Sequence, residues 1–199
     1  YVAVSTDTGC FVYSNTTAAT HRGAAALMDT GINYAALNKR HFRTKSWKRL
    51  KIESMLVEGM ELHDGGTIAL AAVTLEMMDA LGAGETDVED IAAFAGQIEG
   101  VQTAVTIREL PDGTSKLSVR TSGGLNASDV CALLGGGGHA AAAGCNVTGG
   151  AAVAMAAILR AIRRVREGEY SHRVEARGRA ELALLAQEFN QLTDRLQTT

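Results

Sequence analysis

The chain has 199 residues, of which 46% are hydrophobic and 21% are charged, and its formal net charge is −3. These values are typical of a globular protein with one or two cores and exclude a disordered or fibrous chain. The slightly acidic balance argues against a broad basic surface for long duplex nucleic acid but allows a local basic pocket for a small anion. Three cysteines without CxxC spacing argue against a disulfide framework or a zinc site and indicate a reducing, cytoplasmic setting.

The first part of the chain predicts a strand followed by helices. Residues 1–4 form an apolar run that starts without methionine, which predicts a strand continuing from a missing segment. Asp7 would then follow the carboxyl end of this strand, where open α/β sheets bind ligands, although a single Asp in a polar turn is a common alternative. Helices are expected at 20–29, 34–42 and 46–62. A His-Asp-Gly-Gly break at 63–66 predicts the boundary between domains 1–64 and 65–165.

Residues 65–165 predict a smaller α/β domain with a mixed sheet. The expected elements are a buried strand, two helices, the two strands of a hairpin and a further helix, at 68–73, 75–81, 88–99, 103–110, 116–121 and 126–134. The hairpin is the clearest of these, because both strands alternate and a Pro-Asp-Gly turn joins them. Counting by twos places Arg108 and Arg120 on one sheet face, so we expect the two arginines to converge there.

A run of glycines is the most unusual local feature. Gly135, Gly136, Gly137 and Gly138 precede His139 and a run of alanines. Each glycine costs about 0.5–1 kcal/mol relative to alanine in regular structure, so the run predicts that something approaches the backbone closely. The alanines favour a helix, and a glycine loop that opens into a helix would aim backbone N–H groups at a phosphate or carboxylate. A flexible turn before a helix is the alternative that this motif leaves open.

The end of the chain has the apolar spacing of coiled-coil helices. A first series is spaced 3-4-3 and consists of Met155, Ile158, Ile162 and Val165. A second is spaced 3-4-3-4 and consists of Leu182, Leu185, Phe189, Leu192 and Leu196. This spacing predicts a two-helix, coiled-coil-like tail and a homodimer. The longest apolar run, 151–159, has about half the length of a membrane span, so none is expected in this chain.

Several blocks together resemble the DHH phosphoesterases, and their order and spacing match as well. The blocks are Thr-Asp-Thr-Gly-Cys-Phe at 6–11 with 13–17, Ile-Glu-Gly-Val at 98–101, Leu-Ser-Val-Arg at 117–120, and Gly-Gly-Gly-Gly-His at 135–139 with 142–144. The resemblance covers about residues 1–165 and is closest to the oligoribonuclease and phosphoadenosine-phosphate phosphatase branch. It implies an α/β fold in which the end of a DHH domain precedes a DHH-associated domain.

The resemblance also implies a function. It implies a phosphoesterase that hydrolyses short oligonucleotides or small nucleotides at a two-metal, usually manganese, site. Asp7 would be one metal ligand, whereas Arg120, His139 and the glycine run would bind the substrate; Arg108 is added from strand parity alone. The upstream aspartates and the Asp-His-His motif are absent, so we expect this chain to be a fragment without a complete catalytic site. Two alanines follow His139 where the family usually has a basic or amide residue, which predicts the loss of one phosphate contact.

The tail, 166–199, resembles the connector and second helix of a HAMP signalling module. The resemblance rests on 167–174 and 178–181 and on the Phe-Asn pair at 189–190, and it implies a parallel homodimer. The first apolar series could instead belong to the last helix of the DHH-associated domain. Two alternatives to the phosphoesterase therefore remain open: a nucleic-acid-binding module without catalysis, and a HAMP-type signalling or dimerisation protein.

Overall fold

A computed structural model describes residues 1–168 of the chain. Its contacts divide the chain into two compact units between Trp47 and Lys48. The boundary predicted at 64–65 falls inside the second unit, where the preceding helix and strand pack with the sheet that follows. Among the described residues, no helix has the length and apolar character that crossing a membrane requires.

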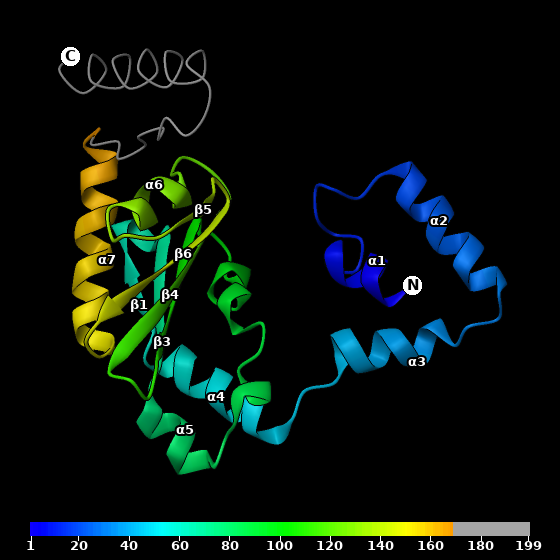
Figure 1. Cartoon of the computed structure of the whole chain (residues 1–199), viewed down its shortest axis with the longest axis horizontal. Helices are drawn as coiled ribbons and strands as arrows, with labels where there is room; N and C mark the ends of the chain where they lie inside the picture. Colours follow the sequence, from blue (N-terminus) through cyan, green and yellow to red (C-terminus); the bar gives the residue numbers. More distant parts are fainter. Residues whose placement is uncertain (169–199) are drawn as a thin grey trace, which may run out of the picture. The chain divides into compact units, whose positions relative to one another are not determined.

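The first unit consists of short helices around a cluster of aromatic rings. Its helices are α1 (Val2–Asp7), α2 (Ala18–Asp29) and α3 (Tyr34–Asn38), and a π-helical turn, Lys39–Arg43, continues α3 (Figure 1). The ring of Tyr1 lies 6.4 Å from that of Phe11 and 6.5 Å from that of Tyr34, measured between centroids. Phe11 in turn stacks on His21. Helix α2 confirms the helix predicted at 20–29.

The strand predicted at residues 1–4 is wrong, because this segment is helix α1. Hydroxyl groups hold the helix locally: Ser5 and Thr8 donate to carbonyl oxygens three and four residues earlier, at 2.9 and 2.7 Å. Such side-chain bonds give a short β-branched run an alternative to strand pairing. Asp7 is the last residue of α1 and is exposed, so it does not follow a strand as the sequence predicts.

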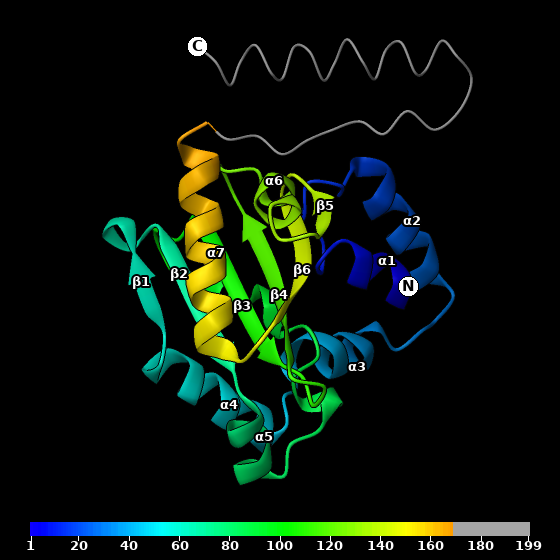
Figure 2. The ribbon, with the colours of Figure 1, turned by 60° about the vertical axis from the view of Figure 1, so that its left-hand side comes forward.

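The second unit is built on a six-stranded mixed sheet with the order β1-β2-β3-β4-β6-β5 (Figure 2). The strands are β1 (Glu61–His63), β2 (Ile68–Val73), β3 (Thr103–Glu109), β4 (Thr114–Thr121), β5 (Gly137–His139) and β6 (Ala142–Thr148). Only β2 and β3 run parallel; the other neighbouring strands are antiparallel. The hairpin β3–β4 confirms the one that alternation predicts, and it sets Val105 opposite Val119.

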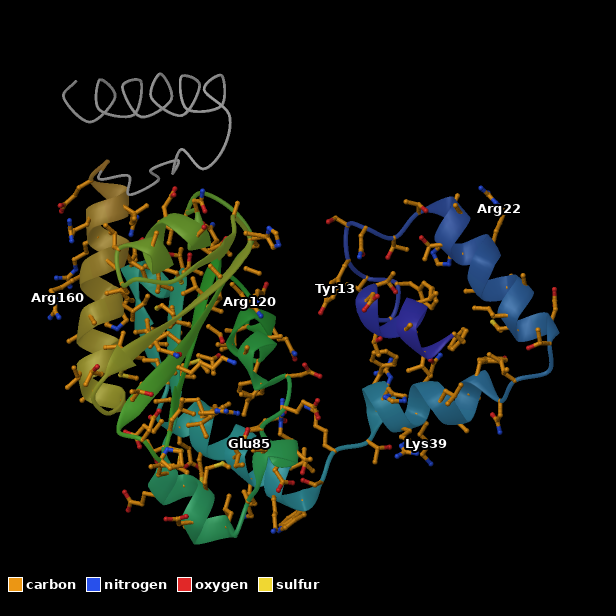
Figure 3. All side chains as sticks on the ribbon, viewed as in Figure 1. Tyr13, Arg22, Lys39, Glu85, Arg120 and Arg160 are labelled. Atoms are coloured by element: carbon orange, nitrogen blue, oxygen red, sulfur yellow. The ribbon has the colours of Figure 1, made fainter. Side chains whose placement is uncertain are left out.

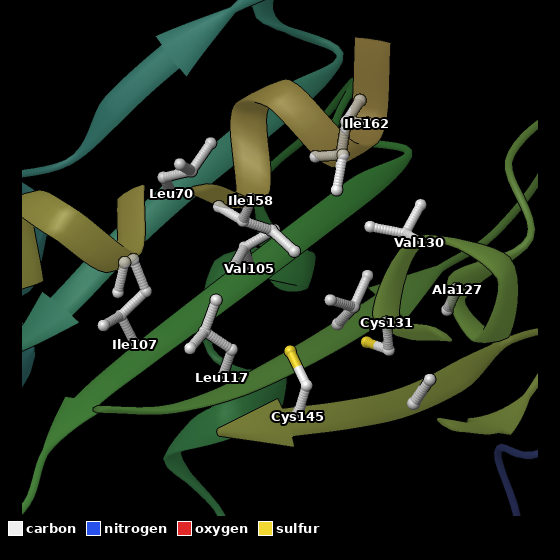
Figure 4. Packing of buried hydrophobic residues seen from close by; sticks show 14 of the residues in the cluster. Leu70, Val105, Ile107, Leu117, Ala127, Val130, Cys131, Cys145, Ile158 and Ile162 are labelled. Carbon is white, nitrogen blue, oxygen red and sulfur yellow. The ribbon is translucent and has the colours of Figure 1, made fainter. Parts of the chain in front are cut away.

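Two cores lie on the two faces of this sheet. On one face, α6 (Ala127–Ala132) and α7 (Ala151–Arg166) cover Leu70, Val105 and Leu117 (Figure 4). On the other face, α4 (Trp47–Glu58) buries Ile52 and Leu56 against small side chains of β2 and β3. Helix α5 (Leu75–Leu81) follows β2, as predicted.

The helix predicted at 88–99 is wrong. This segment forms 3₁₀ turns at Glu85–Asp87, Ile91–Ala93 and Ala95–Gln97. Asp90 adopts a left-handed conformation with φ of 58°, which interrupts any continuous α-helix. The turns bury Ile91 and Ala95 in the second core. The helix predicted at 46–62 is also shorter than expected, because the chain leaves α4 at Glu58 to enter β1.

Helix α7 uses its apolar stripe inside the unit. Ile158, Ile162 and Val165 are buried against the sheet, and Met155 packs beside them. The first apolar series of the predicted tail is therefore the core face of the last helix of this unit, which was one of the two interpretations left open by the sequence. The second series, from Leu182 onward, lies outside the described residues.

Candidate functional site

The last two glycines of the run, Gly137 and Gly138, lie in edge strand β5 with His139, so the predicted glycine loop opening into a helix is wrong. β5 pairs with β6, which contains Ala142 and Ala143 of the alanine run expected to be helical; Ala140 and Ala141 form the turn between the two strands. A Cβ atom at Gly136 would lie 2.2 Å from the carbonyl oxygen of Gly144, and one at Gly138 would lie 2.7 Å from that of Ala142. The close backbone approach predicted from the glycines is confirmed at these two positions, and β6 makes it.

Arg120 and His139 lie in one row of cross-strand neighbours. Arg120 of β4 is opposite Ala142 of β6, and Ala142 is opposite His139 of β5. Adjacent strands are about 4.8 Å apart, so the backbones of Arg120 and His139 are separated by about 10 Å. Ala142 places only a methyl group between them, and both longer side chains are exposed. Two donors thus face solvent across a gap that a phosphate group can bridge.

Arg108 shares this sheet face with Arg120 but does not meet it. Arg108 lies opposite Lys116, which is four residues before Arg120 along β4. At about 3.3 Å per residue, this spacing separates the two positions by roughly 13 Å. The guanidinium of Arg108 instead pairs with the carboxylate of Glu85, with 2.9 Å between Nη1 and Oε2. The shared face is as predicted, whereas the convergence of the two arginines is not found.

A cavity of about 390 Å³ lies on the same face, between the hairpin and the 3₁₀ segment. The sheet contributes Thr106, Arg108, Lys116 and Ser118, and the segment contributes Glu85, Thr86, Val88, Glu89, Asp90, Ile91 and Ala92. Figure 3 shows Glu85 and Arg120 within this unit. Sequence reasoning missed the cavity, because its outer wall was expected to be a regular helix.

Cys131 and Cys145 lie together in the core next to the glycine strand (Figure 4). A hydrogen bond with Cys145, together with burial, raises the pKa of the Cys131 thiol. The carbonyl of Cys131 accepts a hydrogen bond from the N–H of Gly136 at 2.9 Å, which ties the start of the glycine run to α6. Both cysteines are thus buried core residues, and the backbone of Cys131 fixes the position of Gly136 just before β5.

Asp7 belongs to no group of three or more metal-binding side chains among residues 1–168. Within residues 1–168, no three His, Cys, Asp or Glu side chains form a group that could hold a metal ion. A two-metal site needs several carboxylate or imidazole ligands, so the described residues do not form one by themselves. The assignment of Asp7 as a metal ligand stays a prediction from the family resemblance.

The chain is similar to known protein families and to two curated relatives. Residues 67–167 match the DHHA1 domain, and residues 154–198 match the HAMP domain. The bifunctional oligoribonuclease and PAP phosphatase NrnA of Thermus thermophilus is 35% identical over 147 residues, which cover 73% of this chain and 43% of the relative. A relative from Streptococcus mutans, named as a probable enzyme of the same kind, is 26% identical over 146 residues, 73% of this chain and 46% of its own.

The solved structure of an exopolyphosphatase-related protein from Bacteroides fragilis has the same fold. It superposes with a TM-score of 0.74 at 23% identity, covering 81% of this chain and 48% of that protein. The chain spans less than half the length of the curated relatives it matches. The DHHA1 match extends over about half of the chain and includes Arg120, the glycine strand and His139. The chain therefore belongs to the DHH phosphoesterase family, of which it contains the DHHA1 domain.

Proposed function

We propose that this chain is the substrate-binding part of a phosphoesterase that hydrolyses short oligonucleotides or small nucleotides such as phosphoadenosine phosphate. The observation that carries the proposal is the row in which Arg120 and His139 flank Ala142. A guanidinium donates two parallel hydrogen bonds to a phosphate, and an imidazole N–H can donate a third. Family membership and the names of the two curated relatives support the same class of substrate.

Strand β5 adds backbone donors to this proposed site. It is the last strand of the sheet, so the outward-facing N–H groups of β5 have no neighbouring strand within residues 1–168. Gly137 has open space around the position of a Cβ atom, which allows a ligand to approach the backbone there. Arg120 orients the phosphate from β4, and β5 with His139 closes the other side. Manganese, when bound, would supply the activation of water for phosphoryl transfer, with Asp7 as one ligand.

Equilibrium binding tests the proposal directly. The chain is titrated with phosphoadenosine phosphate and with a 5′-phosphorylated dinucleotide, by calorimetry at low ionic strength. Arg120→Gln should weaken both ligands about tenfold or more, because a charge-assisted hydrogen bond contributes about 1.5–3 kcal/mol. Arg160→Gln, on the exposed side of α7, removes the same charge elsewhere and should change affinity less than about twofold. Unchanged affinity in Arg120→Gln would overturn the proposal.

The match of residues 154–198 to the HAMP domain favours a second candidate function, a signalling or dimerisation protein. In that case the DHHA1 domain would act as a nucleotide sensor for the tail. Nucleotide binding would then change the oligomeric state of the chain, which sedimentation with and without phosphoadenosine phosphate would detect. An oligomeric state that does not respond to the nucleotide argues against the signalling function.

A further inference from the structure

Cys131 and Cys145 lie at the two ends of the segment that carries the glycine run and His139. Cys131 is in α6, shortly before the run, and Cys145 is in β6, shortly after the alanines. Strand β5 and the turn that joins it to β6 lie entirely within residues 132–144. A covalent bond between the two sulfur atoms would therefore close this whole segment into a loop.

The two thiols interact with each other in the core. Figure 4 shows their sulfur atoms turned toward each other. The Cys131 thiol donates a hydrogen bond to the sulfur of Cys145, and this bond raises the pKa of Cys131 and lowers that of Cys145. A disulfide requires sulfur atoms about 2.05 Å apart, so the hydrogen-bonded pair needs only a short further approach.

Gly136 holds the two cysteines in this position. Its N–H donates to the carbonyl oxygen of Cys131 at 2.9 Å. On its other side it packs so closely that a Cβ atom on the glycine would lie 2.4 Å from the Cβ atom of Cys145. The backbones of both cysteines are thus tied to the same residue, which keeps α6 and β6 at a fixed separation beside the thiols.

We propose that Cys131 and Cys145 form a redox-sensitive pair, which a peroxide converts into a reversible disulfide that locks the segment carrying His139. In a reducing setting the pair stays as two thiols. The inference goes beyond the proposed function, because it concerns a modification of the core and does not depend on which ligand the chain binds.

Cys145 is the thiol that reacts first. It is 7% exposed, whereas Cys131 is completely buried. The hydrogen bond that lowers the pKa of Cys145 stabilises its thiolate, and the thiolate is the form that attacks a peroxide. Such a small opening admits hydrogen peroxide or a similarly small peroxide, whereas exchange with a larger disulfide needs an accessible sulfur atom.

The reaction has two balanced steps. The Cys145 thiolate attacks one oxygen of hydrogen peroxide: an S–O bond forms, the O–O bond breaks, and hydroxide leaves and takes up a proton to give water. The Cys131 sulfur then attacks the sulfur of this sulfenic acid. The S–S bond forms, the S–O bond breaks, and the thiol proton leaves with the hydroxide as a second water. Two thiols lose two electrons in total, and the peroxide gains them.

The disulfide should hold strand β5 more firmly. Among the described residues, β5 is a short edge strand that pairs only with β6. A cross-link that closes a loop of about fifteen residues reduces the conformational entropy that the segment gains when it opens. Opening of β5 exposes its amides to exchange with solvent. Oxidation should therefore slow hydrogen exchange in 135–144 about tenfold or more.

The test uses the whole chain with Cys10→Ser, because Cys10 is the third thiol and lies in the first unit. The folded chain is treated with a few equivalents of hydrogen peroxide, digested and analysed by mass spectrometry. We expect a linked pair of peptides that contain Cys131 and Cys145, with the mass of two hydrogen atoms lost. Dithiothreitol should restore both thiols, and hydrogen exchange is compared between the oxidised and the reduced chain.

Two further variants test the order of the steps. With Cys131→Ser the disulfide cannot form, so a sulfenic acid should accumulate on Cys145 and be trapped by dimedone. With Cys145→Ser the buried Cys131 should stay unmodified. Neither variant should show slower exchange in 135–144 after peroxide treatment. Circular dichroism checks that both variants fold, and the first measurement needs no change in the core.

Three results would overturn the inference. The first is a folded chain in which both thiols survive the peroxide treatment. The second is oxygen added to Cys145 without a link to Cys131 although Cys131 is present. The third is a disulfide that forms only in urea, which would show that the folded core keeps the sulfur atoms apart. None of these measurements uses a nucleotide, so their outcome leaves the proposed function untouched.

Discussion

Gly136 and Cys145 lie so close together that a Cβ atom on the glycine would be 2.4 Å from the Cβ atom of the cysteine. The carbonyl oxygen of Gly144 would be closer still, at 2.2 Å. The backbone of Gly136 cannot easily move away, because its N–H donates to Cys131 at 2.9 Å. The approach of the residue that precedes β5 to β6 therefore requires glycine at position 136 even when no ligand is bound.

Gly136→Ala should destabilise the second unit. The added methyl group meets backbone and a buried side chain, and overpacking of this kind costs about 1–3 kcal/mol. Urea unfolding followed by circular dichroism measures the free energy of unfolding. Gly137→Ala is the matched control, because nothing lies within 4 Å of its Cβ position, and it should change stability by less than about 1 kcal/mol. Equal stability of the two variants would contradict the close approach.

The sequence predicted correctly those elements that are determined by nearby residues, such as turn residues and helix caps. The β3–β4 hairpin follows from alternation around Pro-Asp-Gly, and α6 is capped by Asn126, whose side chain accepts from two backbone N–H groups. The alanines after His139 show the opposite case. They have high helix propensity, yet Ala142 and Ala143 pair with Arg120 and Val119 of β4, and tertiary pairing overrides propensity. No local sequence pattern predicts the pairing of these alanines with β4.

The candidate site divides in the same way. Family resemblance pointed to Arg120 and His139, which are nineteen positions apart in the chain, but only the registers of β4, β6 and β5 put them in one row. The cavity could not be predicted, because its outer wall depends on a backbone conformation at Asp90 that sequence patterns do not encode. Parity placed Arg108 on the correct face and gave no information on its distance from Arg120.

Glu109 is expected to stabilise two helices at once. Its carboxylate accepts hydrogen bonds from the N–H of Leu75 at 3.1 Å and from the N–H of Ala151 at 2.8 Å, at the starts of α5 and α7. A negative charge is favourable at the N-terminus of a helix, and Glu109 lies at the N-termini of both α5 and α7. Glu109→Ala should cost about 1–2 kcal/mol in urea unfolding, as the loss of a helix cap does. Glu99→Ala, at an exposed position, should be nearly neutral. A neutral Glu109→Ala would rule out the double capping role.

Asp64 should make stability depend on pH in acid. Its carboxylate accepts from Arg166 at 2.6 Å, and this hydrogen bond, with a smaller contribution from Thr67, lowers the pKa of Asp64. Because the folded-state pKa is below the unfolded one, the contact stabilises the fold above pH ~4 and this contribution is lost as pH falls through the folded pKa. Asp64→Asn should therefore lower the melting temperature slightly at pH 6 and not at pH 2.

The contact of Asp64 with Arg166 is exposed to solvent, so the effect should be small and should shrink in high salt. Asp79→Asn on α5 provides a carboxylate control at an exposed position. A difference between Asp64→Asn and wild type that is equally large at pH 2 would mean that the contact acts by packing and not by charge.

The predicted homodimer should depend on the second apolar series of the tail and not on α7. In α7, Ile158, Ile162 and Val165 are already buried against the sheet of their own chain. The series from Leu182 to Leu196 has the 3-4-3-4 spacing of coiled-coil a and d positions, so we expect it to form the intermolecular seam. Leu185→Glu places a charge in this seam and should convert a dimer into a monomer at tens of micromolar, measured by sedimentation velocity.

Gln187→Glu adds the same charge outside the seam and should leave the dimer intact. A wild-type chain that sediments as a monomer, or a Leu185→Glu variant that stays dimeric, would show that the tail does not mediate association.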